Sequence, residues 1–191
     1  MAWNNDQVSR EETDKILEVA KKCLVVAGDL VELGCYRGDT SLMLAELIRG
    51  SDKKLWIYDS FEGLPEKLEQ DQSVVGENFK AGELLVTKRE VKERFLRSGL
   101  PVPIIKKAWF NELDFTDLPP KICFAFLDGD FYQSIKDSLR LVEPFMAEGS
   151  VIMVHDYKNE ALPGVAKAVD EWKKDKRIKF QEYGSLGIIM I

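Results

Sequence analysis

No stretch of this chain of 191 residues is apolar for long enough to cross a membrane. The longest apolar runs, such as Ser150–Val154 and Gly187–Ile191, are much shorter than the roughly 18 residues that a membrane span requires. The segment Met1–Arg10 also lacks the hydrophobic stretch of a signal peptide. The sequence therefore predicts a cytoplasmic protein with no membrane partner.

Basic residues are not in excess either. Lysine and arginine together number 27, against 33 aspartate and glutamate residues, so the formal net charge is −6 at pH 7. A chain with this balance has no overall basic field that would gather nucleic acid or anionic lipid. Nucleic acid is therefore not expected as a partner.

Cysteine and histidine are scarce. The cysteines, Cys23, Cys35 and Cys123, stand far apart and form no CxxC pair. We interpret them as reduced thiols rather than as a disulfide framework or a zinc site. The only histidine, His155, follows the apolar run Val151–Val154. A histidine in such a position is often a hydrogen-bonded packing residue, and this interpretation stays open beside a functional one.

Short apolar segments alternate with amphipathic helical patterns along most of the chain. The segments typical of strands are Asp29–Leu33, Leu55–Tyr58, Pro103–Ile105, Ile122–Leu127 and Val151–Val154. Five helical patterns are present. The first follows the Ser9/Glu12 capping box, the second begins at a Thr40 or Ser41 cap, and the last starts at Pro163. The third contains Leu84, Val91 and Phe95, and the fourth contains Ile135, Leu139 and Val142. Strands that alternate with helices predict an α/β sandwich of three layers, in which helices cover both faces of a parallel sheet.

The C-terminal end of the chain has a different pattern. Ile178–Phe180 and Leu186–Ile191 flank Tyr183-Gly184-Ser185, which is typical of a hairpin. We therefore expect a seven-stranded, mostly parallel sheet with an antiparallel C-terminal hairpin, in a single domain over residues 1–191. The segment Ser60–Leu100 is too long for a simple connection, and we interpret its polar first half as a lid insertion over the site.

The first two strands end in residues that suit a nucleoside cofactor. Ligands bind beyond the carboxyl ends of the strands in an open parallel sheet. Gly34 and Gly38 lie between the first strand and a helix without forming GxGxxG, and such a loop brings N–H groups to an anionic group. Asp59 ends the second strand, where it can accept both hydroxyl protons of an adenosine ribose. The alternative is that Asp59 only caps a helix or turn.

The fourth and fifth strands also end in polar residues. Asp128-Gly129-Asp130 follows one strand and His155-Asp156 follows the next. Adjacent strands lie about 4.8 Å apart, so these groups can share one cation or hold a proton acceptor beside it. The alternative is that Asp128 and Asp156 cap the helices that follow. Trp109-Phe110, after the third strand, is either core or the wall of an adenine pocket.

Together these motifs resemble one enzyme family. They are Glu32-x-Gly34-x-x-x-Gly38, Asp59-Ser60-Phe61-Glu62-Gly63-Leu64-Pro65, Trp109-Phe110 with Leu118-Pro119, Asp128-Gly129-Asp130-x-Tyr132 and Asp156-Tyr157. The pattern is similar to the macrocin O-methyltransferase family of S-adenosylmethionine enzymes, which methylate sugar hydroxyls. The similarity runs from about Val31 to Trp172. It implies a class I methyltransferase (Rossmann-like) fold, with a divalent ion, usually magnesium, at the ends of the fourth and fifth strands.

The resemblance also implies which residues form the site. Those that would contact the cofactor are Glu32, Gly34, Tyr36, Arg37, Gly38, Thr40, Ser41, Asp59, Ser60, Phe61, Trp109, Phe110 and Asp128. Asp128 and Asp156 would hold the metal, and His155 stands where the family usually has another aspartate. Imidazole is a poor ligand for magnesium but a fair one for manganese, iron or zinc, so the identity of the metal is left open. Asp128 and His155 are the candidate catalytic residues.

The sequence thus predicts a metal-assisted O-methyltransferase that acts on a sugar or other small-molecule hydroxyl. The chain lacks most of the N-terminal extension of typical family members, where part of the acceptor pocket would lie. The alternative function is non-catalytic binding of S-adenosylmethionine, in which His155 has ended metal binding. A nicotinamide-dependent oxidoreductase is disfavoured because GxGxxG is absent and the last strand is reversed. The acceptor and the formation of a homo-oligomer are left open.

Overall fold

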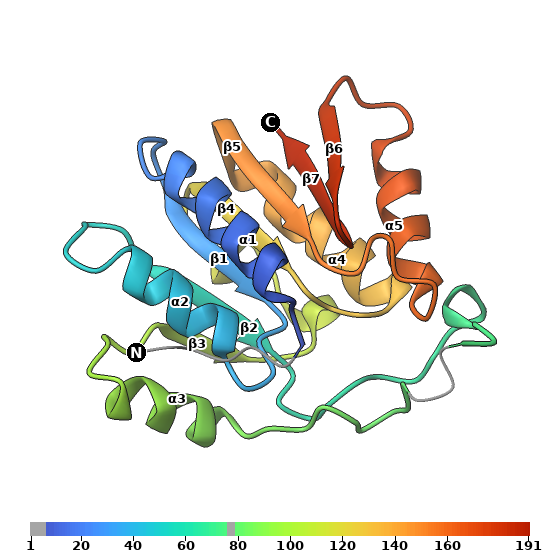
Figure 1. The fold of residues 1–191 in the computed structure, drawn as a ribbon, viewed down its shortest axis with the longest axis horizontal. Helices are drawn as coiled ribbons and strands as arrows, with labels where there is room; N and C mark the ends of the chain where they lie inside the picture. Colours follow the sequence, from blue (N-terminus) through green and yellow to red (C-terminus); the bar gives the residue numbers. More distant parts are fainter. Residues whose placement is uncertain (1–6, 76–78) are drawn as a thin grey trace.

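A computed structural model describes residues 7–75 and 79–191, and seven strands of this part form one twisted sheet (Figure 1). The strands are β1 (Asp29–Leu33), β2 (Leu55–Asp59), β3 (Ile104–Lys107), β4 (Ile122–Leu127), β5 (Met146–Val154), β6 (Lys179–Tyr183) and β7 (Leu186–Met190). Their order across the sheet is β3-β2-β1-β4-β5-β7-β6. The first five strands pair in parallel, whereas β7 runs antiparallel to both β5 and β6. The predicted mostly parallel sheet and C-terminal hairpin are confirmed.

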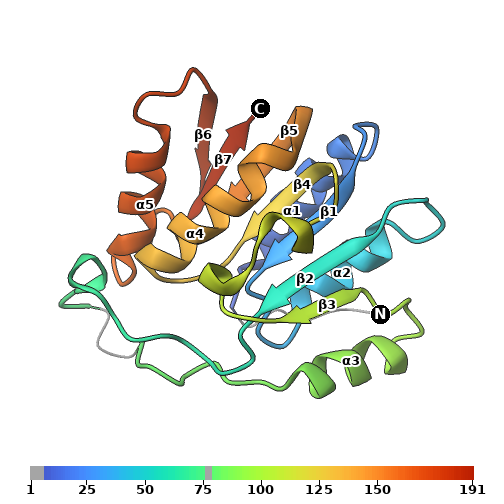
Figure 2. The same cartoon turned by 180° about the vertical axis from the view of Figure 1, so that it is seen from behind.

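Helices cover both faces of this sheet (Figures 1 and 2). They are α1 (Arg10–Cys23), α2 (Asp39–Leu47), α3 (Lys88–Arg97), α4 (Tyr132–Val142) and α5 (Pro163–Lys173). Short 3-10 turns occur at Glu69–Asp71, Phe110–Glu112, Phe115–Asp117 and Glu143–Phe145. The helices α1, α2 and α3 lie over one face and α4 and α5 over the other, which gives the expected three layers.

The central strand β4 contributes to both layers of the core. Successive side chains of a strand point to opposite faces. Phe124 and Phe126 therefore pack in the cluster that includes α1, α2 and α3, while Ala125 and Leu127 pack in the cluster of α4 and α5. All four are fully buried. This double burial explains why Ile122–Leu127 is apolar without alternation.

Some predicted boundaries of helices and strands are wrong. The helix α2 is capped by Gly38, with φ +80°, rather than by Thr40 or Ser41, because the Ser41 hydroxyl donates a hydrogen bond to Glu32 instead. Leu84 has a positive φ and precedes α3, which begins after the capping box of Thr87 and Glu90. The strand β5 starts at Met146, five residues before the expected Val151.

The segment Ser60–Leu100 has two parts of different character. In α3, Val91 and Phe95 are fully buried and belong to the core. The part before α3, whose residues 76–78 lie outside the described ones, crosses the end of the sheet, and several of its residues line the cleft described below (Figure 1). The lid function of this segment stays a prediction.

Two expectations concern the membrane. None of the helices in the described residues is long and apolar enough to span one. The expectation that Met1–Arg10 holds no signal peptide falls mostly on residues 1–6, which lie outside the described part of the chain.

Candidate active site

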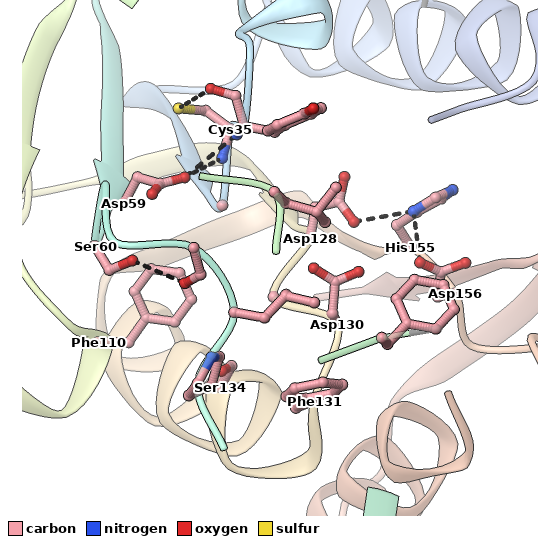
Figure 3. Close-up of a pocket in the computed structure, with 18 of the residues that line it drawn as sticks. Cys35, Asp59, Ser60, Phe110, Asp128, Asp130, Phe131, Ser134, His155 and Asp156 are labelled. Atoms are coloured by element: carbon pink, nitrogen blue, oxygen red, sulfur yellow. Dashed lines mark hydrogen bonds and ion pairs between the residues drawn. The ribbon is translucent and has the colours of Figure 1, made fainter. Parts of the chain in front are cut away.

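One cleft of about 550 Å³ collects the polar residues at the carboxyl ends of β1, β2, β4 and β5. Figure 3 shows Cys35 and Asp59 on one side of it and Asp128, His155 and Asp156 on the other. The predicted site residues that line the cleft are Glu32, Gly34, Tyr36, Arg37, Thr40, Asp59, Ser60, Trp109, Phe110, Asp128, His155 and Asp156. Gly38, Ser41 and Phe61 are not among its lining residues. Gly38 caps α2, Ser41 is fully buried behind the cleft wall, and Phe61 packs in the core.

Asp59 holds the glycine loop that follows β1. Its Oδ2 accepts the N–H groups of Cys35 at 2.8 Å and Tyr36 at 3.3 Å, and its Oδ1 accepts the N–H group of Phe61 at 2.7 Å. The loop donors are therefore largely used within the protein, because the Gly34 and Gly38 N–H groups also bond to backbone carbonyls. An anionic ligand group would instead meet the N-terminal turn of α2.

Gly34 brings this loop close to the end of β4. Its φ is +88°, and a Cβ atom there would lie 2.0 Å from the carbonyl oxygen of Asp128. Only glycine fits this backbone conformation and this approach. Because Gly34 has no side chain, the loop that follows β1 can lie in close contact with Asp128 at the end of β4.

Glu32 is a buried acid in the wall of the cleft. Its carboxyl group accepts a hydrogen bond from the Ser41 hydroxyl. Burial raises the pKa of Glu32 to about 8, and the nearby charges of Asp128, Asp59 and Asp39 add to this effect. A cationic ligand group near Glu32 would stabilise its ionised carboxylate, whose hydrogen-bond donor, the Ser41 hydroxyl, carries no charge.

His155 lies between two carboxylates. Its Nδ1 is 2.9 Å from Asp128 Oδ1 and 3.0 Å from Asp156 Oδ2 (Figure 3). Burial favours the neutral imidazole, but the two carboxylates outweigh burial and hold the pKa of His155 well above its ordinary value. The expected convergence of the β4 and β5 ends is thus present. Asp156, with φ +59°, also accepts a hydrogen bond from the Asn159 side chain.

Several acids of the cleft were not among the predicted site residues, and Asp130 is one of them. Asp130 follows Gly129 in the turn after β4, and its carboxyl group points toward Asp128, His155 and Asp156 in Figure 3. Burial and the charges of Asp128 and Asp156 raise the pKa of Asp130 well above its ordinary value. Its place in the Asp-Gly-Asp string was a usable signal, since the string directly follows a buried strand.

Asp71 is another acid of the cleft that the sequence did not reveal. It is 1% exposed, and its carboxylate accepts the N–H groups of Leu68 at 3.0 Å and Tyr132 at 2.7 Å. It lies between the N-termini of α4 and α5, where a Cβ atom on Gly164 would be 1.9 Å from its Oδ1. Asp71 thus attaches the segment before α3 to both helices. No local pattern relates it to Tyr132, 61 residues later.

The aromatic pair after β3 forms part of the cleft wall. Trp109 and Phe110 both line the cleft and are partly exposed. A Cβ atom on Gly129 would lie 3.2 Å from the Phe110 ring, so this glycine gives the ring its room. The interpretation of the pair as a wall is thus favoured over full burial in the core. The three cysteines are free and buried, as expected of reduced thiols.

Comparisons of the sequence identify a family. The model of the macrocin-O-methyltransferase (TylF) family matches residues 8–182. An 8-demethyl-8-(2,3-dimethoxy-alpha-L-rhamnosyl)-tetracenomycin-C 4'-O-methyltransferase of Streptomyces olivaceus is 30% identical over 145 residues, which are 71% of this chain and 55% of that protein. A demethyldecarbamoylnovobiocin O-methyltransferase of Streptomyces niveus is 29% identical over 181 residues, 83% of this chain and 65% of that protein. The chain thus spans between half and two thirds of these relatives.

Solved structures share the fold. The O-methyltransferase NovP superimposes with a TM-score of 0.83 at 24% identity, over 97% of this chain and 82% of that one. The calicheamicin methyltransferase CalS11 gives a TM-score of 0.77 at 17% identity, over 95% of this chain and 80% of that one. These neighbours confirm the class I methyltransferase fold.

Proposed function

The chain belongs to the macrocin-O-methyltransferase (TylF) family, and on this premise we propose that it transfers the methyl group of S-adenosylmethionine to a hydroxyl oxygen of a sugar or another small molecule. One observation carries the proposal. A single cleft joins a loop held by Asp59 to the group of Asp128, His155 and Asp156. The loop suits binding of the cofactor, and the group of three side chains suits removal of a proton from the acceptor hydroxyl.

The cleft fits such a cofactor in size and in chemistry. Its volume of about 550 Å³ lies within the range of roughly 300–1,000 Å³ typical of small-molecule sites. Asp59 Oδ1 accepts the Phe61 N–H group and has a second lone pair that can accept a ribose hydroxyl. The N-terminus of α2 suits the carboxylate end, Glu32 suits an ammonium group, and Trp109 with Phe110 suits the adenine ring.

The chemistry divides between the ligand and the chain. S-adenosylmethionine supplies a methyl group on a sulfonium centre, which is electrophilic as it stands. The protein has to orient the acceptor hydroxyl and remove its proton. Asp128 is the better candidate base, because a protonated His155 cannot accept a proton. His155, in contact with Asp128 Oδ1, adjusts the basicity of that carboxylate.

A divalent ion fits the same group of residues. Asp128, His155 and Asp156 each offer one ligand atom, and these atoms lie within 4.8 Å of one another. Asp128 and Asp156 would each hold the ion through a carboxylate oxygen, and His155 through a ring nitrogen that has lost its proton. Two oxygens and a nitrogen suit manganese, iron or zinc better than magnesium. Such an ion would supply positive charge that lowers the pKa of the acceptor hydroxyl.

A second candidate function rests on the contacts of His155. Its imidazolium already pairs with both carboxylates that would hold the ion. A protein in which this ion pair persists would bind S-adenosylmethionine without transferring its methyl group.

The two candidates are separated by binding and turnover. We expect S-adenosylhomocysteine to bind the purified protein in a calorimetric titration, with and without Mn²⁺. We also expect radiolabelled methyl groups to pass from S-adenosylmethionine to neutral glycosides, with methyl α-L-rhamnoside as the first probe. Binding without transfer to any glycoside would favour the second candidate. Absence of binding would contradict both.

A further inference from the structure

The helix α3 packs directly on the loop that follows β1. Gly38, at the end of this loop, has φ +80°, and a Cβ atom there would lie 3.3 Å from Cγ1 of the buried Val91. Arg94, three residues after Val91, reaches the same loop, because its guanidinium group donates a hydrogen bond to the Arg37 carbonyl at 2.6 Å. The loop is therefore held by α3 as well as by Asp59.

Arg94 also forms an ion pair with Asp39, the first residue of α2. Its guanidinium nitrogen lies 2.5 Å from Asp39 Oδ1, and the contact joins residues 55 positions apart in the chain. The two side chains are 29% and 14% exposed. Because both are partly shielded from water, their attraction is screened less than that of a pair at the open surface.

The position of Asp39 explains why its charge matters. Asp39 and Thr40 form the start of α2 and line the cleft, where the helix N-terminus would meet the carboxylate end of the cofactor. The free N–H groups and the dipole of a helix N-terminus attract an anion. An uncompensated carboxylate at the first helical residue would repel the same anion. Arg94 cancels that charge, so the N-terminal turn of α2 keeps its attraction for a carboxylate.

We infer that Arg94 is a positioning residue for the cofactor of the proposed methyl transfer. It neutralises Asp39 and holds the Arg37 carbonyl, and the N-terminal turn of α2 can then accept the carboxylate of S-adenosylmethionine. Arg94 is not among the residues that line the cleft, so it acts through α2 without touching the cofactor. This inference rests on the proposed function and deepens it, because it assigns the recognition of one end of the cofactor to a residue outside the cleft.

The test compares two ligands that differ in one group. S-adenosylhomocysteine and S-adenosyl-3-thiopropylamine, which is the same molecule without its carboxylate, are titrated calorimetrically into the unmodified protein and into Arg94→Gln. We expect Arg94→Gln to weaken binding of S-adenosylhomocysteine about tenfold and binding of the thiopropylamine at most about twofold. Binding of the thiopropylamine also shows that the variant is folded.

A second substitution separates charge from loop structure. The double variant Arg94→Gln with Asp39→Asn removes both charges of the pair, and it should regain an affinity for S-adenosylhomocysteine within about threefold of that of the unmodified protein. Arg89→Gln is the matched control, because Arg89 carries the same charge on the same helix but pairs with Glu93 at the surface. This control should leave the affinities for both ligands unchanged.

Three results would overturn the inference. They are an unchanged affinity of Arg94→Gln for S-adenosylhomocysteine, an equal loss of affinity for the two ligands, and a double variant that binds S-adenosylhomocysteine no better than Arg94→Gln. The proposed function is judged separately, by binding of S-adenosylhomocysteine to the unmodified protein. Absence of that binding would contradict the function and the inference together, whereas the three results above leave the function standing.

Discussion

The carboxylate of Asp59 accepts the backbone N–H group of Cys35 at 2.8 Å, across the 24 residues between the end of β2 and the loop after β1. The residue expected to bind the ribose of the cofactor is therefore also the residue that shapes the cofactor loop. Loss of this carboxylate affects cofactor affinity in two ways, through the missing acceptor and through the loosened loop.

Asp59→Ala should weaken binding of S-adenosylhomocysteine by about 1.5–3 kcal/mol, the usual value of a hydrogen bond to a charged group. Asp29→Ala provides a matched control, because Asp29 also accepts a backbone N–H group, from Lys54, but lies outside the cleft. The control should lower stability and leave cofactor affinity unchanged. If calorimetry gives the same affinity for S-adenosylhomocysteine in Asp59→Ala and in the unmodified protein, Asp59 does not contribute to cofactor binding.

Glu32 makes stability depend on pH in a defined direction. Its pKa in the folded protein is about 8, above the ordinary 4.5, so the folded state retains a proton that the unfolded state releases. The contribution of Glu32 is fully present below about pH 4.5 and is lost as pH rises toward 8. Glu32→Gln should flatten this loss and raise the free energy of unfolding at pH 8 by at least about 1 kcal/mol relative to the parent. Urea denaturation between pH 5 and 8.5 measures the free energy of unfolding of each variant. The control is Glu11→Gln, which changes an exposed glutamate. Parallel curves for Glu32→Gln and the parent would be inconsistent with a buried protonated acid.

Metal binding should release the proton of His155. Because the pKa of His155 is held well above its ordinary value, Nδ1 must lose a proton before it can bind an ion. We expect apparent Mn²⁺ affinity to rise with pH, by about tenfold per unit while His155 is protonated. His155→Asp should flatten this dependence and increase the preference for magnesium. Asp137→Asn, which removes a cleft acid outside the proposed ligand group, is the control for charge. If His155→Asp retains the parent's metal preference and pH profile, His155 serves only packing.

The segment before α3 should become more protected when ligands bind. Its polar stretches bury little apolar surface of their own, whereas Val91 and Phe95 keep α3 in the core. Hydrogen exchange should therefore slow in residues 62–75 and 79–86 on addition of S-adenosylhomocysteine and an acceptor, while α3 changes little and serves as the internal control. Equal protection with and without both ligands would contradict a lid.

Gly164→Ala tests how that segment is attached. The new Cβ atom would meet Asp71 Oδ1 at 1.9 Å and the Tyr132 backbone nitrogen at 2.9 Å. Asp71 must then leave its place, and we expect a loss of about 1–3 kcal/mol in the free energy of unfolding, together with faster exchange in residues 62–75. Gly50→Ala is a matched control for glycine replacement in open space, although its positive φ adds some strain. Unchanged exchange in Gly164→Ala would mean that Asp71 does not hold the segment.

The sequence was sufficient to predict the sheet and the convergence of polar side chains at the ends of β4 and β5. Ile122–Leu127 and Val151–Val154 are short apolar runs between helical patterns, which favours buried strands, and parallel neighbours bring their carboxyl ends together. Asp128, His155 and Asp156 therefore had to converge. The hairpin was equally readable, because Tyr183-Gly184-Ser185 separates two short strands.

The features that could not be predicted from the sequence depend on interactions between residues far apart in the chain. The cap of α2 was misassigned because Ser41 bonds to Glu32, nine residues earlier, instead of capping its own helix. Asp71 carries no local signal, since its carboxylate finds Tyr132 through the tertiary fold. The charged surroundings of Asp130 come from Asp128, Asp156 and His155, and the fold brings the last two beside it from the next strand.

The position of Asp71 between α4 and α5 has a consequence for synthesis on the ribosome. Asp71 emerges long before Gly164, so the N-terminal half of the chain is exposed while the two helices that will receive this carboxylate are still being translated. The sheet can begin to form from β1 and β2, but the wall of the cleft must wait for the last third of the protein. A nascent chain interrupted before α5 would therefore present an unattached, protease-accessible segment where the finished protein has one side of the cleft.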